Sequence, residues 1–204
     1  MASATFIIRA MLGIGILGVF FWGTFVLGGE EPENLVSNGG FEVKGIDYNG
    51  PSSWNSTPVA EMKEFFTCEW DSTTFHTGQR SASIRVEENH PDRQVFYNWN
   101  QAPLNCTPGN SYTITGWAKA QDLNEPAFIV VQCWDTGMKK VLGHTNIEDM
   151  EKVVGATDWV PVKTAFKVPE DTWRVVVLAG IPGHSNPGGK VWFDDLTVTE
   201  VHGD

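Results

Sequence analysis

Basic residues are scarce in this sequence. The chain has 14 Lys and Arg against 25 Asp and Glu, which gives a formal net charge of -11 at pH 7. Nucleic-acid-binding surfaces need clustered Lys and Arg, so this balance argues against DNA or RNA as a partner. An acidic surface suits an exported domain that binds a cation or neutral sugars.

Cysteine is scarce as well, and the common catalytic and metal motifs are missing. The chain has 3 cysteines, Cys68, Cys106 and Cys133, without the C-x-x-C spacing of zinc and redox sites. In an oxidising compartment they allow one disulfide and one free thiol, and the sequence leaves the pairing open. Its 5 histidines form no H-E-x-x-H motif, so metal-dependent hydrolysis has no support.

A long apolar run is present at the N-terminus. Residues 6–27 are apolar except for Arg9 and Thr24, and the run is long enough to span a bilayer as a helix. It reaches nearly to Glu30 and lacks a good cleavage site, which favours a transmembrane signal anchor (1–30) over a cleaved signal peptide. Because positive charge stays in the cytoplasm, residues 31–204 are expected at the cell surface or in the periplasm, or secreted if the segment is cleaved.

From residue 34 onward the sequence predicts an all-β domain. Short runs of β-branched and aromatic residues alternate with Gly, Pro, Asn and Asp, as in an antiparallel sandwich. The expected strands are Ser81–Glu87, Arg93–Gln101, Tyr112–Ala120, Ala127–Trp134, Val160–Val168, Thr172–Ala179 and Lys190–Val201.

Two longer stretches, residues 44–67 and 136–158, break this rhythm and are expected to be loops. In the second, Thr145–Glu148 fits a capping box, and Met150, Val153 and Val154 follow at roughly helical spacing. We expect a short helix there that closes one end of the core, in preference to a lid over a binding site.

Several segments in the same order resemble carbohydrate-binding modules related to families 4, 9 and 22. Asn34–Glu42 and Val191–Glu200 resemble the first and last strands of these modules, and three further segments complete the match: residues 78–86, 101–120 and 159–169. The resemblance implies a galactose-binding-like, jelly-roll β-sandwich over residues 31–204 with paired chain ends. It also implies a structural calcium.

In such modules oxygen atoms of the first strand, of the turn before the second strand and of the last strand hold the calcium. Carried over, the ligands are Glu42, Asp194 and backbone carbonyls near Gly78 and Arg80. Strand alternation favours Asp194 over Asp195, because it places Asp194 on one face with Leu196 and Val198. The alternative is that Glu42 and Asp194 are solvated acids at strand ends, but two such acids on paired strands would repel each other.

Sugar recognition needs aromatic faces that stack on pyranose rings and polar groups that contact hydroxyls. Trp117 lies on the polar side of its strand, and Trp134 shares a side of its strand with Gln132. Arg85 points outward from a third strand, and Tyr97 and Trp99 share one face of a fourth. We therefore expect these six residues to line the binding site, whereas Trp54, Trp159 and Trp192 are expected to be structural.

Together these features predict a membrane-anchored module that binds polysaccharide or glycan chains and performs no chemistry, acting alone or beside a glycoside hydrolase system. The alternative is an envelope domain for protein interaction or structure that has lost sugar binding. A small glycoside hydrolase ranks third, since it would need a pair of carboxylates across a cleft.

Overall fold

A computed structural model describes residues 32–56 and 60–201, which belong to one compact unit, Pro32–Asp204. The predicted transmembrane anchor, residues 1–30, lies outside the described residues. Within the described part, no helix has the length and apolar character needed to cross a bilayer.

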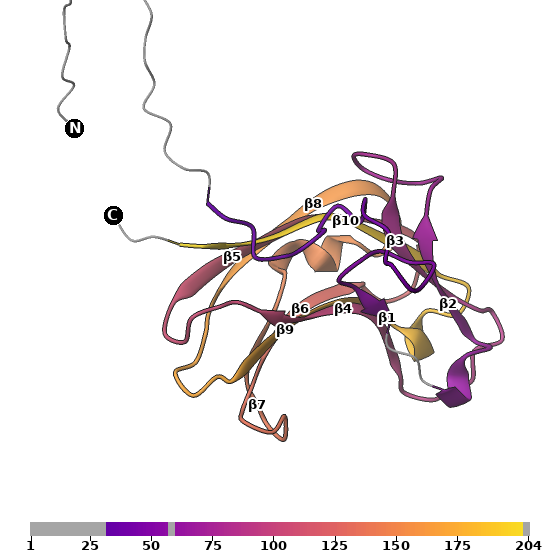
Figure 1. The fold of residues 1–204 in the computed structure, drawn as a ribbon. Helices are drawn as coiled ribbons and strands as arrows, with labels where there is room; N and C mark the ends of the chain where they lie inside the picture. The colour runs from indigo at the N-terminus through magenta and orange to yellow at the C-terminus, as the bar shows by residue number, and fades with distance from the viewer. Residues whose placement is uncertain (1–31, 57–59, 202–204) are drawn as a thin grey trace, which may run out of the picture. The chain divides into compact units, whose positions relative to one another are not determined.

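The unit is a sandwich of two antiparallel sheets of five strands each (Figure 1). Sheet I has the order β1 (Asn55–Ser56), β4 (Phe96–Leu104), β9 (Arg174–Pro182), β6 (Phe128–Trp134), β7 (Val141–Asn146). Sheet II has the order β2 (Phe66–Asp71), β3 (Ser81–Val86), β10 (Lys190–Glu200), β5 (Ser111–Leu123), β8 (Gly155–Lys167). Three short 3-10 helices, η1 (Ala60–Met62), η2 (Glu148–Lys152) and η3 (Gly183–Ser185), join the strands. The predicted all-β sandwich is confirmed.

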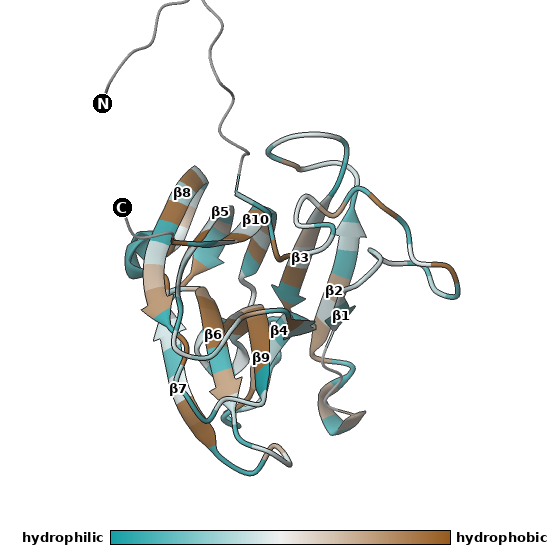
Figure 2. Cartoon of the chain, turned by 60° about the vertical axis from the view of Figure 1, so that its left-hand side comes forward, coloured by the Kyte–Doolittle hydropathy of each residue, from teal (hydrophilic) through white to brown (hydrophobic). Residues whose placement is uncertain are grey.

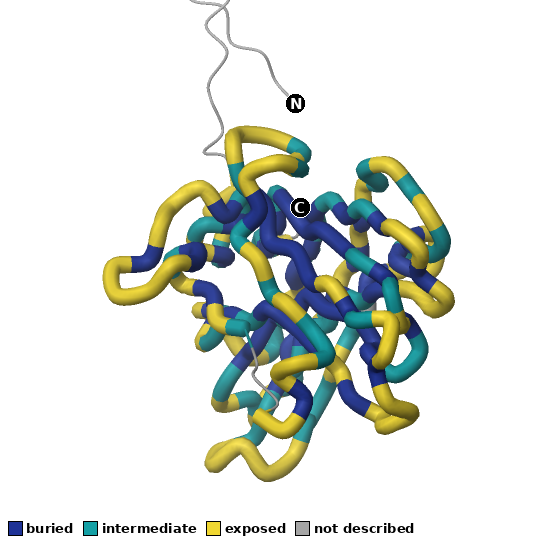
Figure 3. Tube along the Cα trace, turned by 90° about the vertical axis from the view of Figure 1, so that its right-hand side faces the viewer, coloured by how far each residue is buried: buried dark blue, intermediate teal, exposed yellow. Residues whose placement is uncertain are grey.

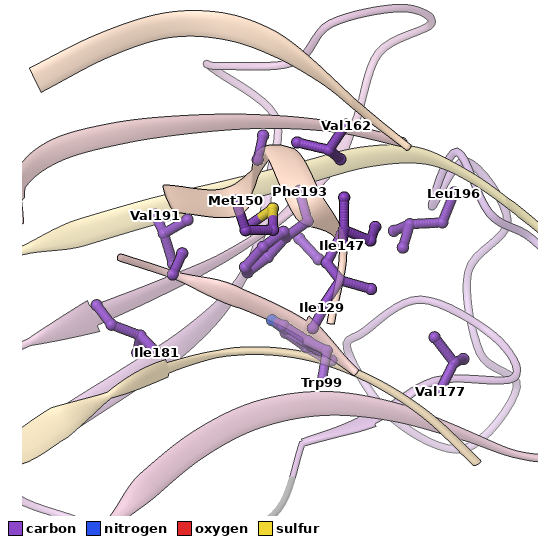
Figure 4. Close-up of a cluster of buried hydrophobic side chains, with 14 of the residues drawn as sticks. Trp99, Ile129, Ile147, Met150, Val162, Val177, Ile181, Val191, Phe193 and Leu196 are labelled. Carbon is purple, nitrogen blue, oxygen red and sulfur yellow. The ribbon is translucent and has the colours of Figure 1, made fainter. Parts of the chain in front are cut away.

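Strand alternation builds the core between the sheets. Figure 2 shows hydrophobic and hydrophilic residues following one another along the strands, and Figure 3 shows buried residues inside and exposed residues on the loops. Ile84, Ile114 and Phe193 of sheet II and Ile129 and Val177 of sheet I are all fully buried. Part of this cluster is drawn in Figure 4.

All seven predicted strands are present, but the sequence analysis missed β1, β2 and β7. β1 has two residues, and β7 contains Gly143 and His144, so neither shows a clear alternation. In β2 the inward residues are Phe66, Cys68 and Trp70, each only half buried because β2 is an edge strand. The alternation along β2 is therefore too weak to predict a strand.

The stretch after β7 closes one end of the core, as expected. Ile147, Met150 and Val153 are 2%, 3% and 0% exposed, and Figure 4 shows the first two facing the core side chains. The expected capping box is wrong, because Ile147 occupies the N-cap position and no side chain caps the helix. The helix has only five residues, all in 3-10 geometry.

The start of the described chain runs beside β10, so the predicted pairing of the two ends is confirmed. The N–H of Leu35 donates to the carbonyl of Val198 at 2.8 Å, and the N–H of Leu196 donates to the carbonyl of Gly39 at 3.0 Å. Residues 34–42 nevertheless form turns in place of the expected strand, with positive φ at Asn38 (52°) and Phe41 (57°).

Candidate functional site

The outer face of sheet I is hollowed by a cavity of about 430 Å³. Its walls come from the outward residues of β4, β9 and β6: Phe96, Asn98, Phe128, Val130, Gln132 and Leu178. Most of this lining is apolar, and two carboxamides supply hydrogen-bonding groups. Such a surface suits a ligand that combines flat apolar faces with hydroxyl groups.

Two phenylalanines form the aromatic part of the cavity. Phe96 is 48% exposed, and its ring meets Phe128 edge to face, with centroids 6.0 Å apart and planes at 76°. Phe128 pairs with Gly180 of β9, where an added Cβ would lie 2.5 Å from Cζ of Phe128. The missing side chain at Gly180 therefore makes room for the Phe128 ring to lie across β9.

Polar side chains flank this apolar floor. Nδ2 of Asn100 donates to the side-chain oxygen of Asn98 at 3.3 Å and to the carbonyl of Asn55 at 3.0 Å. On β6, Nε1 of Trp134 donates to Oε1 of Gln132 at 3.2 Å. The NH₂ group of Gln132 therefore points away from Trp134. These contacts orient amide groups on both sides of the cavity.

Of the six predicted sugar-binding residues, the structure brings Gln132 and Trp134 to this face. Gln132 lines the cavity, and Trp134 follows two residues later on the same side of β6. The sequence analysis missed Phe96, Asn98 and Phe128. Phe128 has the same parity as Gln132 and Trp134, so the alternation of β6 contained the signal.

Tyr97 and Trp99 were predicted to line the sugar-binding site, but the structure buries both of them in the core. The two side chains are 0% and 4% exposed and point between the sheets. The hydroxyl of Tyr97 lies 2.7 Å from Nε2 of His90, and Nε1 of Trp99 donates to the carbonyl of Ser83 at 3.1 Å. Burial of the larger rings of Tyr97 and Trp99 is more favourable than burial of Phe96, which faces outward on the same strand.

Trp117 and Arg85 lie on the opposite sheet and cannot join the cavity. Arg85 is exposed on β3, and Trp117 lies on the outer side of β5 under the ring of His76, with centroids 3.8 Å apart and planes at 17°. The expected single cluster therefore separates into residues of two distant faces.

The predicted calcium ligands lie near the turn before β3. Oε1 of Glu42 accepts the backbone N–H groups of Gln79 at 2.9 Å and Arg80 at 3.0 Å. Gly78 has φ +65°, and a Cβ there would lie 2.2 Å from the same oxygen. The turn thus wraps closely around the Glu42 carboxylate.

Asp194 is the fully buried acid of this region, with 0% exposure. Burial, and the nearby Asp195 carboxylate, raise the pKa of Asp194 to about 7, although backbone N–H groups of His76, Asp195 and Thr77 oppose the shift. One oxygen, Oδ2, accepts the N–H of His76 at 2.8 Å and that of Thr77 at 3.3 Å.

The alternation argument for Asp194 is wrong. Asp194 pairs with Trp117 and Thr197 with Thr115, so a bulge separates Asp194 from Leu196. Asp195 at its centre has φ 51°, and the bulge places Asp194 on the outer side of β10 while Leu196 points inward. The loop before β3, not the core, buries the carboxylate.

These residues fit a hard cation only in part. Carboxylates are ligands that calcium prefers, and a buried acid favours a cation beside it. The turn, however, directs backbone N–H groups at both carboxylates. Within the described ranges, no three His, Cys, Asp or Glu side chains have a metal-binding arrangement. Backbone carbonyls would have to complete the coordination.

Comparisons with known proteins connect this geometry to a class of modules. The family model described as "Carbohydrate binding domain" (CBM_4_9) matches residues 33–183. No curated protein matches the chain.

Solved structures share the fold at low sequence identity. The CBM22-1 xylan-binding domain of Xyn10C from Paenibacillus barcinonensis is 13% identical, with a TM-score of 0.57 over 87% of this chain and 100% of that one. TmCBM61 in complex with β-1,4-galactotriose is 16% identical, with a TM-score of 0.52 over 83% and 99%. The enzymatically active domain of tailspike protein 4 of bacteriophage CBA120 is 19% identical, with a TM-score of 0.55 over 82% of this chain and only 21% of that one.

Proposed function

Since the chain belongs to the CBM_4_9 family of non-catalytic carbohydrate-binding modules, we propose that the outer face of sheet I binds a polysaccharide chain. The observation that carries the proposal is the cavity with its two phenylalanines and flanking carboxamides.

The proposed binding is by stacking and hydrogen bonding. Pyranose rings would lie on Phe96 and Phe128, where apolar contact replaces water. The carboxamides of Asn98 and Gln132 would accept and donate hydrogen bonds to ring hydroxyls. Because the lining residues follow one another along β6, the face favours a chain of several sugars over a single one.

Binding is tested first with xylan and β-1,4-galactan, because the named neighbours are a xylan-binding domain and a module in complex with β-1,4-galactotriose. With the full chain, Phe128→Ala and Phe96→Ala should each weaken binding about tenfold or more, since each removes buried apolar contact. Trp117→Ala is the matched control, because Trp117 lies on sheet II.

The same measurements distinguish a binding site on sheet I from one on sheet II, and a sugar-binding module from a protein-interaction or structural domain. Loss of binding in Trp117→Ala but not in the phenylalanine variants would move the site to sheet II. A folded protein that binds no polysaccharide would favour the alternative of a protein-interaction or structural domain. Circular dichroism of each variant separates lost binding from lost folding.

We also propose that a calcium ion stabilises the turn around Glu42 and Asp194. Two observations support this proposal: burial raises the pKa of Asp194, so a cation would stabilise its ionised form, and the turn wraps closely around Glu42. Adding calcium should raise the melting temperature, and a chelator should reverse the gain. The same protein with Asp194→Asn should respond little, and an equal response in that variant would refute these ligands.

The N-terminal segment is proposed to anchor the module in a membrane with residues 31–204 outside the cytoplasm. The apolar run of residues 6–27 supports this. Membrane fractionation followed by N-terminal sequencing tests it. A mature protein that begins after residue 30 would show cleavage and secretion instead.

A further inference from the structure

Arg174 adds a positive charge beside the proposed sugar-binding cavity, and a neutral ligand would leave this charge without a partner. It pairs with Trp134 of β6, so its side chain lies on the outer face, next to the end of the cavity formed by Gln132. Gln132 and Trp134 are two positions apart on β6, a distance of about 7 Å along the strand. One bound chain can therefore reach both the cavity and the guanidinium.

The guanidinium lacks a carboxylate partner. Arg174 makes no ion pair with any described residue, and its Nε is buried without a hydrogen-bond partner. Its contact is with the ring of Trp173, whose centroid lies 6.0 Å from Cζ. Since the protein shields Nε, an acceptor from outside the chain would bind the terminal Nη groups, which take part in no ion pair with a described residue.

The outward residues of the described strands around Arg174 include no acid, and the exposed Glu170 and Asp171, in the turn before β9, form no ion pair with it. The outward residues of β4, β6 and β9 are aromatic, aliphatic or carboxamide, and His144 of β7 pairs with Gln132 beside them. The acid nearest in sequence to Trp134 is Asp135, and its Oδ1 accepts the N–H groups of Lys139 and Lys140 at 2.8 Å each.

This absence is notable in a chain with a net charge of -11. An acidic protein repels anionic polymers in general, so an acid-free face with one unpaired Arg is a local exception. Arg binds carboxylates and similar oxyanions through two parallel hydrogen bonds, which makes such contacts strong and directional.

We propose that the ligand of sheet I is an anionic polysaccharide, whose acidic group binds Arg174 while neighbouring sugars occupy the Phe96–Phe128 cavity. The acidic group is the carboxylate of a uronic acid or a sulfate ester, since both offer two oxygens to the guanidinium. This inference rests on the proposed function and narrows its substrate class.

Paired oligosaccharides test the inference with the full chain. A xylan hexamer with a glucuronic acid branch is compared with its carboxyl-reduced form, and a sulfated galactan oligosaccharide with its desulfated form. In one of the two pairs the acidic member should bind about tenfold more tightly at low salt, as expected for a charge-assisted contact. The pair that shows the difference identifies the acidic group, and the difference should shrink as salt rises.

Variants assign the difference to Arg174. Arg174→Gln should remove the preference, so that the acidic and the neutral member of the pair bind with similar affinity. Arg174→Lys should retain part of it, because it keeps the charge but not the planar fork. Lys163→Gln makes the same change in net charge on β8, opposite Thr115 on sheet II, and should keep the full preference.

Equal affinity for both members of each pair, or a preference that survives Arg174→Gln, would overturn the inference. Neutral binding that still depends on Phe128 would in that case leave the proposed function standing. Loss of dependence on Phe128 for every ligand would remove the proposed function itself.

Discussion

At the scale of the residue, the absence of one side chain shapes the proposed binding face. Gly180 lies in the middle of sheet I, between Asn98 of β4 and Phe128 of β6. An added Cβ would lie 2.3 Å from the carbonyl oxygen of Tyr97 and 2.5 Å from Cζ of Phe128. The backbone oxygen cannot move aside without disturbing the sheet.

Gly180→Ala is therefore expected to destabilise the fold by about 1–3 kcal/mol and to displace the Phe128 ring, which weakens sugar binding. Denaturant unfolding and binding to xylan or galactan measure the two effects. Gly143→Ala is the control, because its Cβ would meet only the side chain of Pro169, at 3.0 Å. Unchanged binding in Gly180→Ala would show that Phe128 is not positioned in this way.

Asp194 predicts how stability depends on pH. Its pKa is about 7 in the folded chain and about 3.9 when unfolded. Between these values the folded state holds a proton that the unfolded state has lost, so stability falls as pH rises. This group alone should lower the free energy of unfolding by up to about 4 kcal/mol from pH 4 to pH 7.

Urea unfolding in the presence of a chelator, at several pH values between 4 and 7.5, measures this effect. Asp194→Asn should flatten the profile, because the amide does not titrate. Calcium should oppose the decline above pH 6 if it binds the ionised carboxylate. An unchanged profile in Asp194→Asn would assign the pH dependence to other groups.

At the scale of the element, the side chain of Asn34 joins the first described segment to β10 by hydrogen bonds. Its Oδ1 accepts the N–H groups of Val36 at 3.0 Å and Val198 at 2.9 Å, and its Nδ2 donates to the carbonyl of Leu196 at 3.2 Å. A single side chain thus replaces part of a missing strand ladder.

Asn34→Ala should destabilise the chain by about 1–3 kcal/mol, because it leaves backbone groups of both segments without partners. Glu33→Ala, which changes the exposed neighbouring residue, is the control and should change stability little. Chemical denaturation of both variants provides the comparison. An equal effect in both would mean that the segment is held by its apolar contacts alone.

At the scale of the whole molecule, the two sheets share one hydrophobic core. A contiguous cluster extends from Val36 to Val198 and includes residues from both sheets. Neither sheet can bury its inner face alone, so the sandwich is expected to unfold in one cooperative transition. Far-UV circular dichroism and tryptophan fluorescence should give coincident melting curves. Two separate transitions would show that the sheets are independent.

The sequence by itself determined the strands of the core and the family. Alternation in Phe128–Trp134 and Ser111–Leu123 gave correct inward and outward sets, because one side of each strand is consistently apolar. It also placed Gln132 and Trp134 together, since residues two apart on one strand share a face. The paired chain ends followed from the resemblance of residues 34–42 and 191–200 to the family.

Only the tertiary structure decided which outward residues meet. Alternation divides a strand into two sides, but it does not state which sheet the strand joins, so Trp117 and Trp134 came to lie on opposite faces. It also fails where the register shifts, as at Asp194, and where both sides of a strand carry aromatic rings, as on β4. The binding face depends on cross-strand neighbours such as Gly180 and Arg174, which are distant in sequence from Phe128 and Trp134 and are brought beside them by the pairing of β9 with β6.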